Sequence, residues 1–322
     1  MTTPLQITSV LATLALLAQP VAAWDGFGHM VVASVAYRGL DAKTRKRVDE
    51  LLARNPYFKD KWPALIPAGT SDDDRPRLIF MLAATWPDAI KRDSDYHDDG
   101  SNNGNIPDGP EVLRNTGYDD FNRHKYWHFV DKPFSQDGTD VSSMKVPEPN
   151  ADTQIVAFRD VLKSDSPEDR KSYDLVWLLH LVGDVHQPLH CVTRVSADHT
   201  TGDTGGNDVP FCTATANKCT SELHAFWDNI LGTSKKVATA DTFAGGLTGP
   251  SVTVDDIADA KIWIDKSFAF AKSKVYVNPP VDNGSPPFRA TTGYTGRARA
   301  LAKKQVALAG ARLAKILNTE LN

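Results

Sequence analysis

The stretch that decides the fold is His180-Leu-Val-Gly-Asp184-Val-His186-Gln-Pro-Leu-His190, which holds three histidines and an aspartate. The run before it, Tyr173-Asp-Leu-Val-Trp-Leu-Leu, is mostly apolar and contains no Gly or Pro, which predicts a buried helix. Because His180 and Asp184 are four residues apart, both project from one face of that helix. The chain is therefore expected to be organised around a buried helix with polar groups at its end.

The end of this helix predicts a metal site. Pro188 should end the helix near Gln187, and His190 can then turn back toward the same point. Imidazole nitrogens and a carboxylate that converge on one point suit zinc. The alternative is a helix that merely carries polar residues near its end. Leu, Val and Trp surround these groups, however, and buried ionisable groups need partners, which favours the metal.

Length and charge limit the class of protein. The 322 residues, 41% of them hydrophobic, suffice for one large domain or two small ones with a sizeable core. The formal net charge of −4 predicts no large basic surface, which argues against tight, salt-dependent binding of duplex nucleic acid. It does not exclude an enzyme that engages phosphates through metal ions.

Residues 1–23 are expected to be an export signal, although their start lacks Lys and Arg. Residues 10–17 form an apolar core, and Val21-Ala22-Ala23 offers small residues for cleavage. No later stretch approaches the length of a membrane span. We therefore expect a secreted or periplasmic product that starts at Trp24, forms a single domain over residues 24–322 and has no membrane partner.

The rest of the chain predicts an all-α fold with long loops, because no convincing run of alternating strands occurs. A Thr-, Gly- and Asp-rich stretch leaves room for one short hairpin around residues 205–215. The polar segment 93–124 is long for a loop without a role, and its His97 and His124 are expected to be solvated. Helices are expected over residues 30–38, 42–54, 77–86, 151–163, 254–275 and 296–317, before His180 and from residue 222 onward.

Three cysteines are available for disulfides in an exported chain. Cys212 and Cys219 flank a short polar loop and are the expected pair, although the odd count leaves the pairing open. Cys191 would then be free. It adjoins His190, so it is either a soft zinc ligand or a small buried residue, and we favour the second.

Further His and Asp residues extend the candidate metal site. His224 and Asp228 repeat the four-residue spacing of His180 and Asp184 among apolar neighbours. The whole ligand set is too large for one ion and suits two or three, with Asp184 as the natural bridge. Its members are His29, Asp88, His128, His180, Asp184, His190, His224 and Asp228.

The ordered set of motifs resembles the S-one/P-one nucleases, which are zinc-dependent single-strand nucleases and 3′-nucleotidases. More distantly it resembles the zinc-dependent phospholipases C, which share the multi-helix fold and the trinuclear zinc arrangement. The motifs are Trp24 with His29, Trp86-Pro-Asp88, Trp127-His128-Phe-Val-Asp131, the stretch from His180 to His190, Gly205-Gly-Asn207 and Leu223-His224-Ala-Phe-Trp-Asp228.

The resemblance implies three zinc ions. Because an amine binds a metal only once cleavage exposes it, the third site would need a free Trp24 terminus; otherwise Trp24 is merely an anchor. The implied ligands are Asp88, His128, His180 and Asp184 for the first ion, His190, His224 and Asp228 for the second, and His29, Asp184 and the amine and carbonyl of Trp24 for the third.

The resemblance also implies a mechanism. The first and third ions, bridged by Asp184, would activate a shared water, and cleavage would give a 5′-phosphate and a free 3′-hydroxyl. Asp88 and Asp184 are thus the expected catalytic carboxylates. Lys91 is either a cation beside the pentavalent phosphorus or a solvated surface lysine.

Substrate contacts follow from the same resemblance. Phe129 and Asp131 would hold a base by stacking and hydrogen bonding, unless Phe129 belongs to the core. Asn207 would orient the phosphate. His186, between ligands, is expected behind them or at the surface. The segment 93–124 is longer than expected for the family, lies between two first-zinc ligands, and could shape the substrate cleft.

Three functions compete at this point. The leading one is a monomeric zinc nuclease acting on single-stranded nucleic acid and 3′-nucleotides. The second is a phospholipase C; Phe129 and Asp131 favour a base over a choline headgroup, and Asp228 stands where the lipid enzymes generally carry Glu. The third is a zinc-binding or storage protein, against which the expected open coordination positions count.

Overall fold

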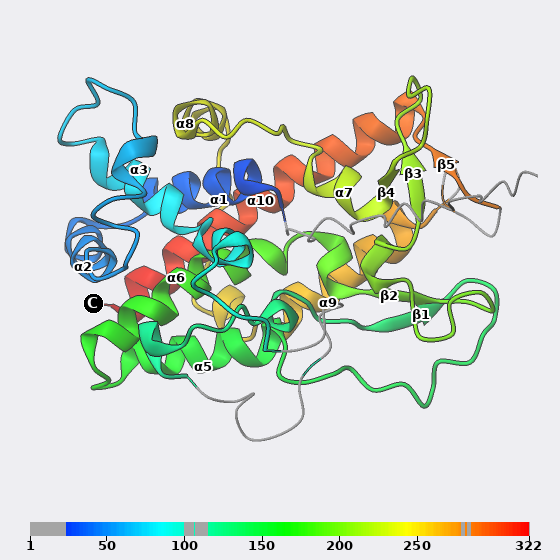
Figure 1. Cartoon of the computed structure of the whole chain (residues 1–322), viewed down its shortest axis with the longest axis horizontal. Coiled ribbons are helices and arrows are strands. Elements are labelled where there is room, and N and C mark those ends of the chain that lie inside the picture. The colour runs from blue at the N-terminus through cyan, green and yellow to red at the C-terminus, as the bar shows by residue number, and fades with distance from the viewer. Residues whose placement is uncertain (1–23, 100–105, 107–114, 278–280, 282–284, 322) are drawn as a thin grey trace, which may run out of the picture.

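The computed structural model describes residues 24–99, 106, 115–277, 281 and 285–321. Helices dominate these residues and the strands are short, so the all-α prediction is confirmed (Figure 1). The predicted export signal, residues 1–23, lies outside the described part. No helix within that part is long and apolar enough to cross a membrane.

Helix α6 (Glu168–Asp184) is the buried helix that the opening stretch predicts. Every residue from Ser172 to Asp184 is buried, and the helix contacts α5 (Ala151–Lys163), which runs beside it in Figure 1. The helix ends at Asp184, earlier than predicted, because the residue before Pro188 takes an extended conformation. A short 3₁₀ helix, η6 (Pro188–Cys191), then carries His190.

Helices α1 (Gly26–Arg38) and α10 (Thr292–Glu320) pack closely against each other on the other side of α6. Gly310 permits this approach, because a Cβ there would lie 2.6 Å from Cβ of Val35. The first helix begins four residues before the predicted start at residue 30, because the Asp25 carboxylate accepts hydrogen bonds from the first free amides.

The remaining helices surround this core. Where the sequence predicted one helix over residues 254–275, the structure has the 3₁₀ turn Asp255–Ile257, helix α9 (Lys261–Phe270) and a π-helical turn Ala271–Val275. The other elements are α2 (Ala42–Leu52), α3 (Arg75–Ala83), α4 (Trp86–Ala89), α7 (Leu223–Asp228) and α8 (Val237–Gly245).

Two small sheets cover one end of the helices. Strands β1 (Pro133–Ser135) and β2 (Thr193–Val195) pair in parallel. Strand β3 (Pro210–Cys212) pairs antiparallel with β4 (Ser221–Glu222) and parallel with β5 (Phe288–Arg289). The antiparallel pair is the predicted hairpin, a few residues later than expected.

The predicted disulfide Cys212–Cys219 is present and closes the loop between β3 and β4. Cys191 is free and buried, and its thiol lies 3.4 Å from the Val185 carbonyl oxygen. Burial raises the pKa of the Cys191 thiol. Of the two interpretations of Cys191, a zinc ligand or a small buried residue, the structure therefore supports the second.

The segment 93–124 corrects one prediction. His97 is exposed as expected, but His124 is only 1% exposed. Its Nδ1 and Nε2 lie 2.5 Å and 2.8 Å from carboxylate oxygens of Asp99 and Asp120, and its ring stacks on Trp127 at 3.6 Å. Burial alone would lower the pKa of His124, but hydrogen bonds with these two carboxylates outweigh it and raise that pKa.

Candidate metal centre

Asp184, the last residue of α6, faces imidazoles from three different segments. Its Oδ1 lies 3.3 Å from Nε2 of His29, which belongs to α1. Its Oδ2 lies 3.0 Å from Nδ1 of His128, at the end of the 3₁₀ turn η5 (Lys125–His128), and 3.4 Å from Nε2 of His180. All four side chains are buried, and the two oxygens of the carboxylate face different imidazoles.

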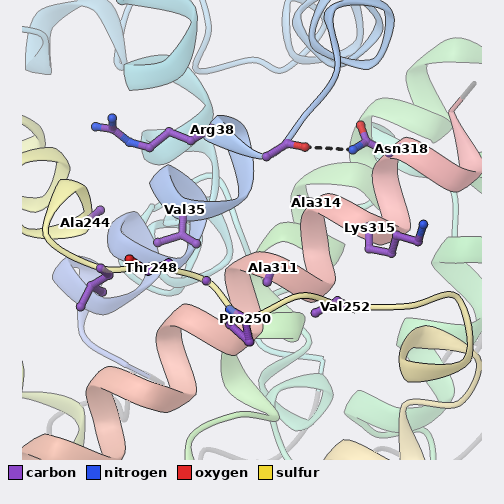
Figure 2. Close-up of a pocket in the computed structure, with 13 residues that line it drawn as sticks. Val35, Arg38, Ala244, Thr248, Pro250, Val252, Ala311, Ala314, Lys315 and Asn318 are labelled. Carbon is purple, nitrogen blue, oxygen red and sulfur yellow. Dashed lines mark hydrogen bonds between the residues drawn. The ribbon is translucent and has the colours of Figure 1, made fainter.

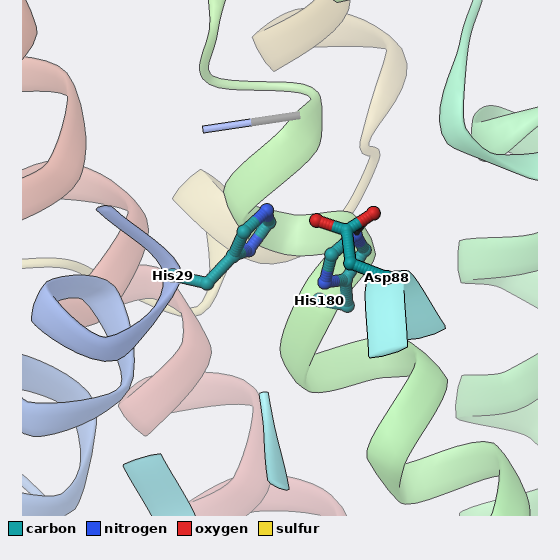
Figure 3. A group of neighbouring side chains, drawn as sticks. All are labelled: His29, Asp88 and His180. Atoms are coloured by element: carbon teal, nitrogen blue, oxygen red, sulfur yellow. Dashed lines mark ion pairs between the residues drawn. The ribbon is translucent and has the colours of Figure 1, made fainter. Parts of the chain in front are cut away.

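Asp88 reaches the same cluster from α4. Figure 3 shows His29, Asp88 and His180 turning toward one another from three elements. The two imidazole rings are stacked, with their centroids 3.7 Å apart. Oδ1 of Asp88 lies 3.7 Å from Nε2 of His180. One ligand atom from each of these three residues lies within 4.8 Å of the others, a spacing that could hold a metal ion. The same holds for His128, His180 and Asp184.

A second cluster joins η6 to α7. Nε2 of His190 and Nε2 of His224 are 3.1 Å apart, and Oδ2 of Asp228 lies 3.5 Å from Nε2 of His224. These three side chains are buried and could also hold a metal ion. Gln187 donates a hydrogen bond to Oδ1 of Asp228 at 2.8 Å, which orients that carboxylate.

Backbone carbonyls fix the tautomers of three of the histidines. Nδ1 lies 2.7 Å from a carbonyl oxygen for His180, and 2.8 Å from one for His190 and for His224. A carbonyl can only accept, so Nδ1 carries the proton and Nε2 presents a lone pair. The facing Nε2 atoms of His190 and His224 are then both acceptors, and a cation between them satisfies both.

Gly205 makes one of these contacts possible. Its carbonyl accepts the bond from His224, its φ is +63°, and a Cβ there would lie 2.5 Å from the Leu189 carbonyl oxygen. A glycine is therefore required where the chain passes behind His224. The phosphate contact predicted for this motif belongs to Asn207 and stays a prediction.

Buried polar atoms without hydrogen-bond partners concentrate at the first cluster. They include both ring nitrogens of His29, Nε2 of His128, Oδ2 of Asp88 and Oδ1 of Asp184. Burying such atoms unpaired is costly. The donor set of imidazole nitrogens and carboxylate oxygens is the one that zinc prefers, so these residues fit a metal centre.

The electrostatics also suit metal binding. Burial lowers the pKa of His29 and of His224 to about 4, and holds the pKa values of His128, His180 and His190 well below the ordinary range. The rings are therefore neutral at pH 7, the form that binds metal. Burial raises the pKa values of the Asp184 and Asp228 carboxyls, and a bound cation would oppose that shift.

Trp24 lies beside both clusters. Its buried indole donates a hydrogen bond to the Gly183 carbonyl at 3.0 Å, and the next amide, of Asp25, donates to the Asp228 carbonyl at 3.2 Å. Gly28 leaves room for this side chain, because a Cβ there would lie 2.6 Å from Cβ of Trp24. The indole is thus an anchor, and the part played by the backbone amine stays a prediction.

Lys91 is buried rather than solvated, with 8% of its surface exposed. Its Nζ lies 2.8 Å from Oδ1 of Asp88. The predicted catalytic lysine therefore places a positive charge on a carboxylate of the first cluster.

Of the predicted substrate residues, Phe129 contacts a cluster directly, and the contacts of Asp131 and Asn207 with substrate stay predictions. Phe129 is partly exposed and stacks on the His190 ring at 4.7 Å. Desolvation, with repulsion from Asp203, raises the pKa of Asp131 to about 7. Asn207 is partly exposed, and its amide donates to the Thr204 carbonyl at 2.6 Å.

One supporting residue, Asp203, was not predicted from the sequence. Asp203 is buried and accepts hydrogen bonds from the Gly206 amide and the Tyr276 hydroxyl, which holds the turn behind His224. Its position inside a polar, Gly-rich stretch gave no signal of burial. His186, expected behind the ligands or at the surface, is buried.

A separate hollow of about 430 Å³ lies between α1, α10 and the chain after α8. Figure 2 shows its lining, which includes Val35, Arg38, Pro250 and Lys315. Among the described residues, those that line it include none of the predicted ligands.

Fold and clusters together define a mainly helical protein with buried sites that could hold metal ions. The sequence profile of the S1/P1 Nuclease family matches residues 24–322, and the chain belongs to this family. It is therefore a hydrolase that acts on phosphodiester bonds, in a family that is typically metal-dependent, and nucleic acid is its class of substrate. The family resemblance drawn from the sequence is confirmed. A comparison with the curated proteins found no match.

Proposed function

We propose that the chain is a trinuclear zinc nuclease that cleaves single-stranded DNA and RNA to 5′-phosphate products and removes phosphate from 3′-nucleotides. The observation that carries the proposal is the position of Asp184, whose Oδ1 faces His29 while its Oδ2 faces His128 and His180. A carboxylate in this position suits a bridge between two ions.

The ligand sets would be those that the family resemblance implies. The groups His128, His180, Asp184 and His190, His224, Asp228 support the first two sites. The third would use His29, Asp184 and the backbone of Trp24, whose indole lies against the residue before Asp184. Removal of residues 1–23 would free the Trp24 amine, and the mature monomer would act in the periplasm or outside the cell.

Bound zinc would supply a water of lowered pKa and neutralise charge on the phosphate. The chain's own groups would orient and shield the reaction. Asp88 and Asp184 would hold the ions beside the reacting phosphate, and the Lys91 ammonium beside Asp88 would add positive charge there. Asn207, two residues after the glycine that contacts His224, would contact a phosphate oxygen.

A single-stranded substrate follows from Phe129 and Asp131. A base can stack on the open side of Phe129, whose other side lies on His190. Because Asp131 has a pKa of about 7, its carboxyl group can accept a hydrogen bond from that base or donate one to it near neutral pH. Stacking needs a base that has left the duplex, which favours single strands.

The test uses purified chain with its N-terminal sequence and zinc content determined. Three activities are then measured with and without chelator: the release of acid-soluble nucleotide from denatured DNA, the release of phosphate from a 3′-nucleotide, and the hydrolysis of phosphatidylcholine. We expect three zinc ions, a Trp24 start, and the first two activities only, both lost in chelator. Hydrolysis of phosphatidylcholine with denatured DNA left intact would instead identify a phospholipase C.

A further inference from the structure

Three residues, Val185, His186 and Gln187, join the last residue of α6 to η6. This linker therefore spaces Asp184 of the first cluster from His190 of the second. A shift of the linker would move one cluster relative to the other.

Neighbouring helices hold the linker at each of its residues. Ser267 of α9 donates a hydrogen bond to the Val185 carbonyl at 2.6 Å. Gln305 of α10 donates to the His186 carbonyl at 3.0 Å. Gln187 itself binds Asp228, so the linker is fixed on its backbone and through a ligand.

The His186 side chain is fixed as well. Its Nδ1 lies 2.7 Å from the Val182 carbonyl and must donate, so Nε2 must accept. Arg312 of α10 supplies the donor, with Nη1 at 2.8 Å from that Nε2. Because a guanidinium only donates, it is compatible with one tautomer of His186 alone.

Arg312 is an unusual residue for this place. It is 3% exposed, and among the ion pairs of the described residues none includes it. Its guanidinium lies 5.1 Å from the centre of the Trp263 ring, and its Nε has no hydrogen-bond partner. Desolvation lowers the pKa of Arg312 to about 10. The charge of Asp256 opposes this shift only in part, because Arg312 makes no close ion pair with it. A buried cation without such a pair is costly, and an apolar side chain would fill the space without that cost. Beside its contact with the Trp263 ring, the specific contact that arginine adds is the bond to His186.

We propose that Arg312 and Gln305 are positioning residues for the metal centre, which hold the linker so that Asp184 and His190 keep the spacing that the two clusters require. This inference rests on the proposed zinc dependence, and it assigns a function in metal binding to a helix that supplies none of the proposed ligands.

The experiment compares Arg312→Met and Arg312→Lys in the full mature chain. The matched control is Arg159→Met, because Arg159 of α5 pairs with Glu320 of α10 at 2.6 Å and also donates to the Ile257 carbonyl, away from the linker. Zinc stoichiometry and affinity are measured by chelator competition, and the thermal unfolding of the zinc-free protein is measured beside them.

We expect Arg312→Met to lose zinc affinity by roughly 10- to 100-fold at one or more ions, the size known for groups that orient ligands. Arg312→Lys, which retains a donor, should recover part of that loss. Arg159→Met should lower the unfolding temperature and leave zinc affinity unchanged. Gln305→Leu removes only the backbone contact and should show a smaller loss, which keeps the test valid if Arg312→Met fails to fold.

The inference would be overturned if folded Arg312→Met or Gln305→Leu bound zinc with wild-type affinity and showed only a lower unfolding temperature. The proposed function would then remain intact. A wild-type chain that binds no zinc would overturn the proposed function, and the inference with it.

Discussion

Replacement of Asp184 by asparagine tests the shared carboxylate directly. The amide has nearly the same shape but carries no charge, and its NH₂ group would point at an imidazole. In the native chain Oδ1 faces His29 and Oδ2 faces His128 and His180, all within 3.4 Å. The substitution therefore weakens metal binding next to His29 and next to His128 and His180 at the same time.

The expected loss follows from that double contact. Removing a group that only orients a ligand costs roughly 10- to 100-fold in metal affinity or activity. Asp184 contacts two groups, so the factors multiply to roughly 10²- to 10⁴-fold, or about 3–5.5 kcal/mol of transition-state stabilisation. In the zinc-free protein the effect should reverse, because burial and the nearby Asp88 raise the pKa of the Asp184 carboxyl and a neutral amide removes that penalty.

Three quantities are measured for Asp184→Asn: kcat/KM on denatured DNA, the zinc content, and the unfolding temperature of the zinc-free protein. The control is His190→Ala, which affects one cluster only. We expect Asp184→Asn to lose more zinc and more activity than His190→Ala, and to unfold at or above the wild-type temperature without zinc. Equal zinc loss and equal residual activity in the two variants would refute the bridging position of Asp184.

Three further substitutions test other parts of the structure. His124→Gln removes a histidine whose pKa in the folded state lies above 6.5, so the stability that it contributes is complete below pH 6.5 and fades as the pH rises through the folded pKa. Urea unfolding should show a free energy of unfolding that is lower than wild type by roughly 1–3 kcal/mol at pH 5.5 and by less at pH 9. A loss of stability that does not depend on pH would contradict this reasoning. Lys91→Met removes the cation at Asp88 and should lower kcat by roughly 10- to 1,000-fold with KM little changed, as steady-state kinetics would show; an unchanged kcat would exclude Lys91 from the reaction. Phe129→Ala removes the stacking surface and should weaken cleavage of single strands by about 1–3 kcal/mol in kcat/KM, while hydrolysis of a phosphodiester without a base stays the same; an equal loss on both substrates would indicate a packing role.

Local sequence signals predicted the parts of the fold that depend on neighbouring residues. The helix Ala151–Lys163 has the predicted bounds, because the Asn150 side chain caps its first turn. The pairs His180/Asp184 and His224/Asp228 each lie on one helix, as their spacing predicts.

Tertiary context decided what the sequence did not predict. His124 sits in a polar segment, and one of its carboxylates, Asp99, lies 25 residues earlier in the chain, so no local pattern indicated burial. The same applies to Arg312, which contacts His186 across 126 residues and resembles a surface arginine in its own helix. Helix 254–275 was predicted as continuous because its apolar pattern continues through the breaks in the backbone.

The candidate metal centre combines both kinds of information. Each cluster contains one helical pair at the four-residue spacing, which forms as soon as its helix forms. The remaining ligands come from other elements, so they reach the pairs only when α1 and η5 have packed against α6 and η6 has met α7. Zinc would therefore bind the folded chain and the unfolded chain with very different affinities, and its binding free energy would add directly to the stability of the whole core. The helical pairs explain why the site could be recognised in the sequence. The buried residues behind the site, such as Asp203 and Arg312, follow no such spacing and contact partners far away in the chain, so no local pattern indicated them.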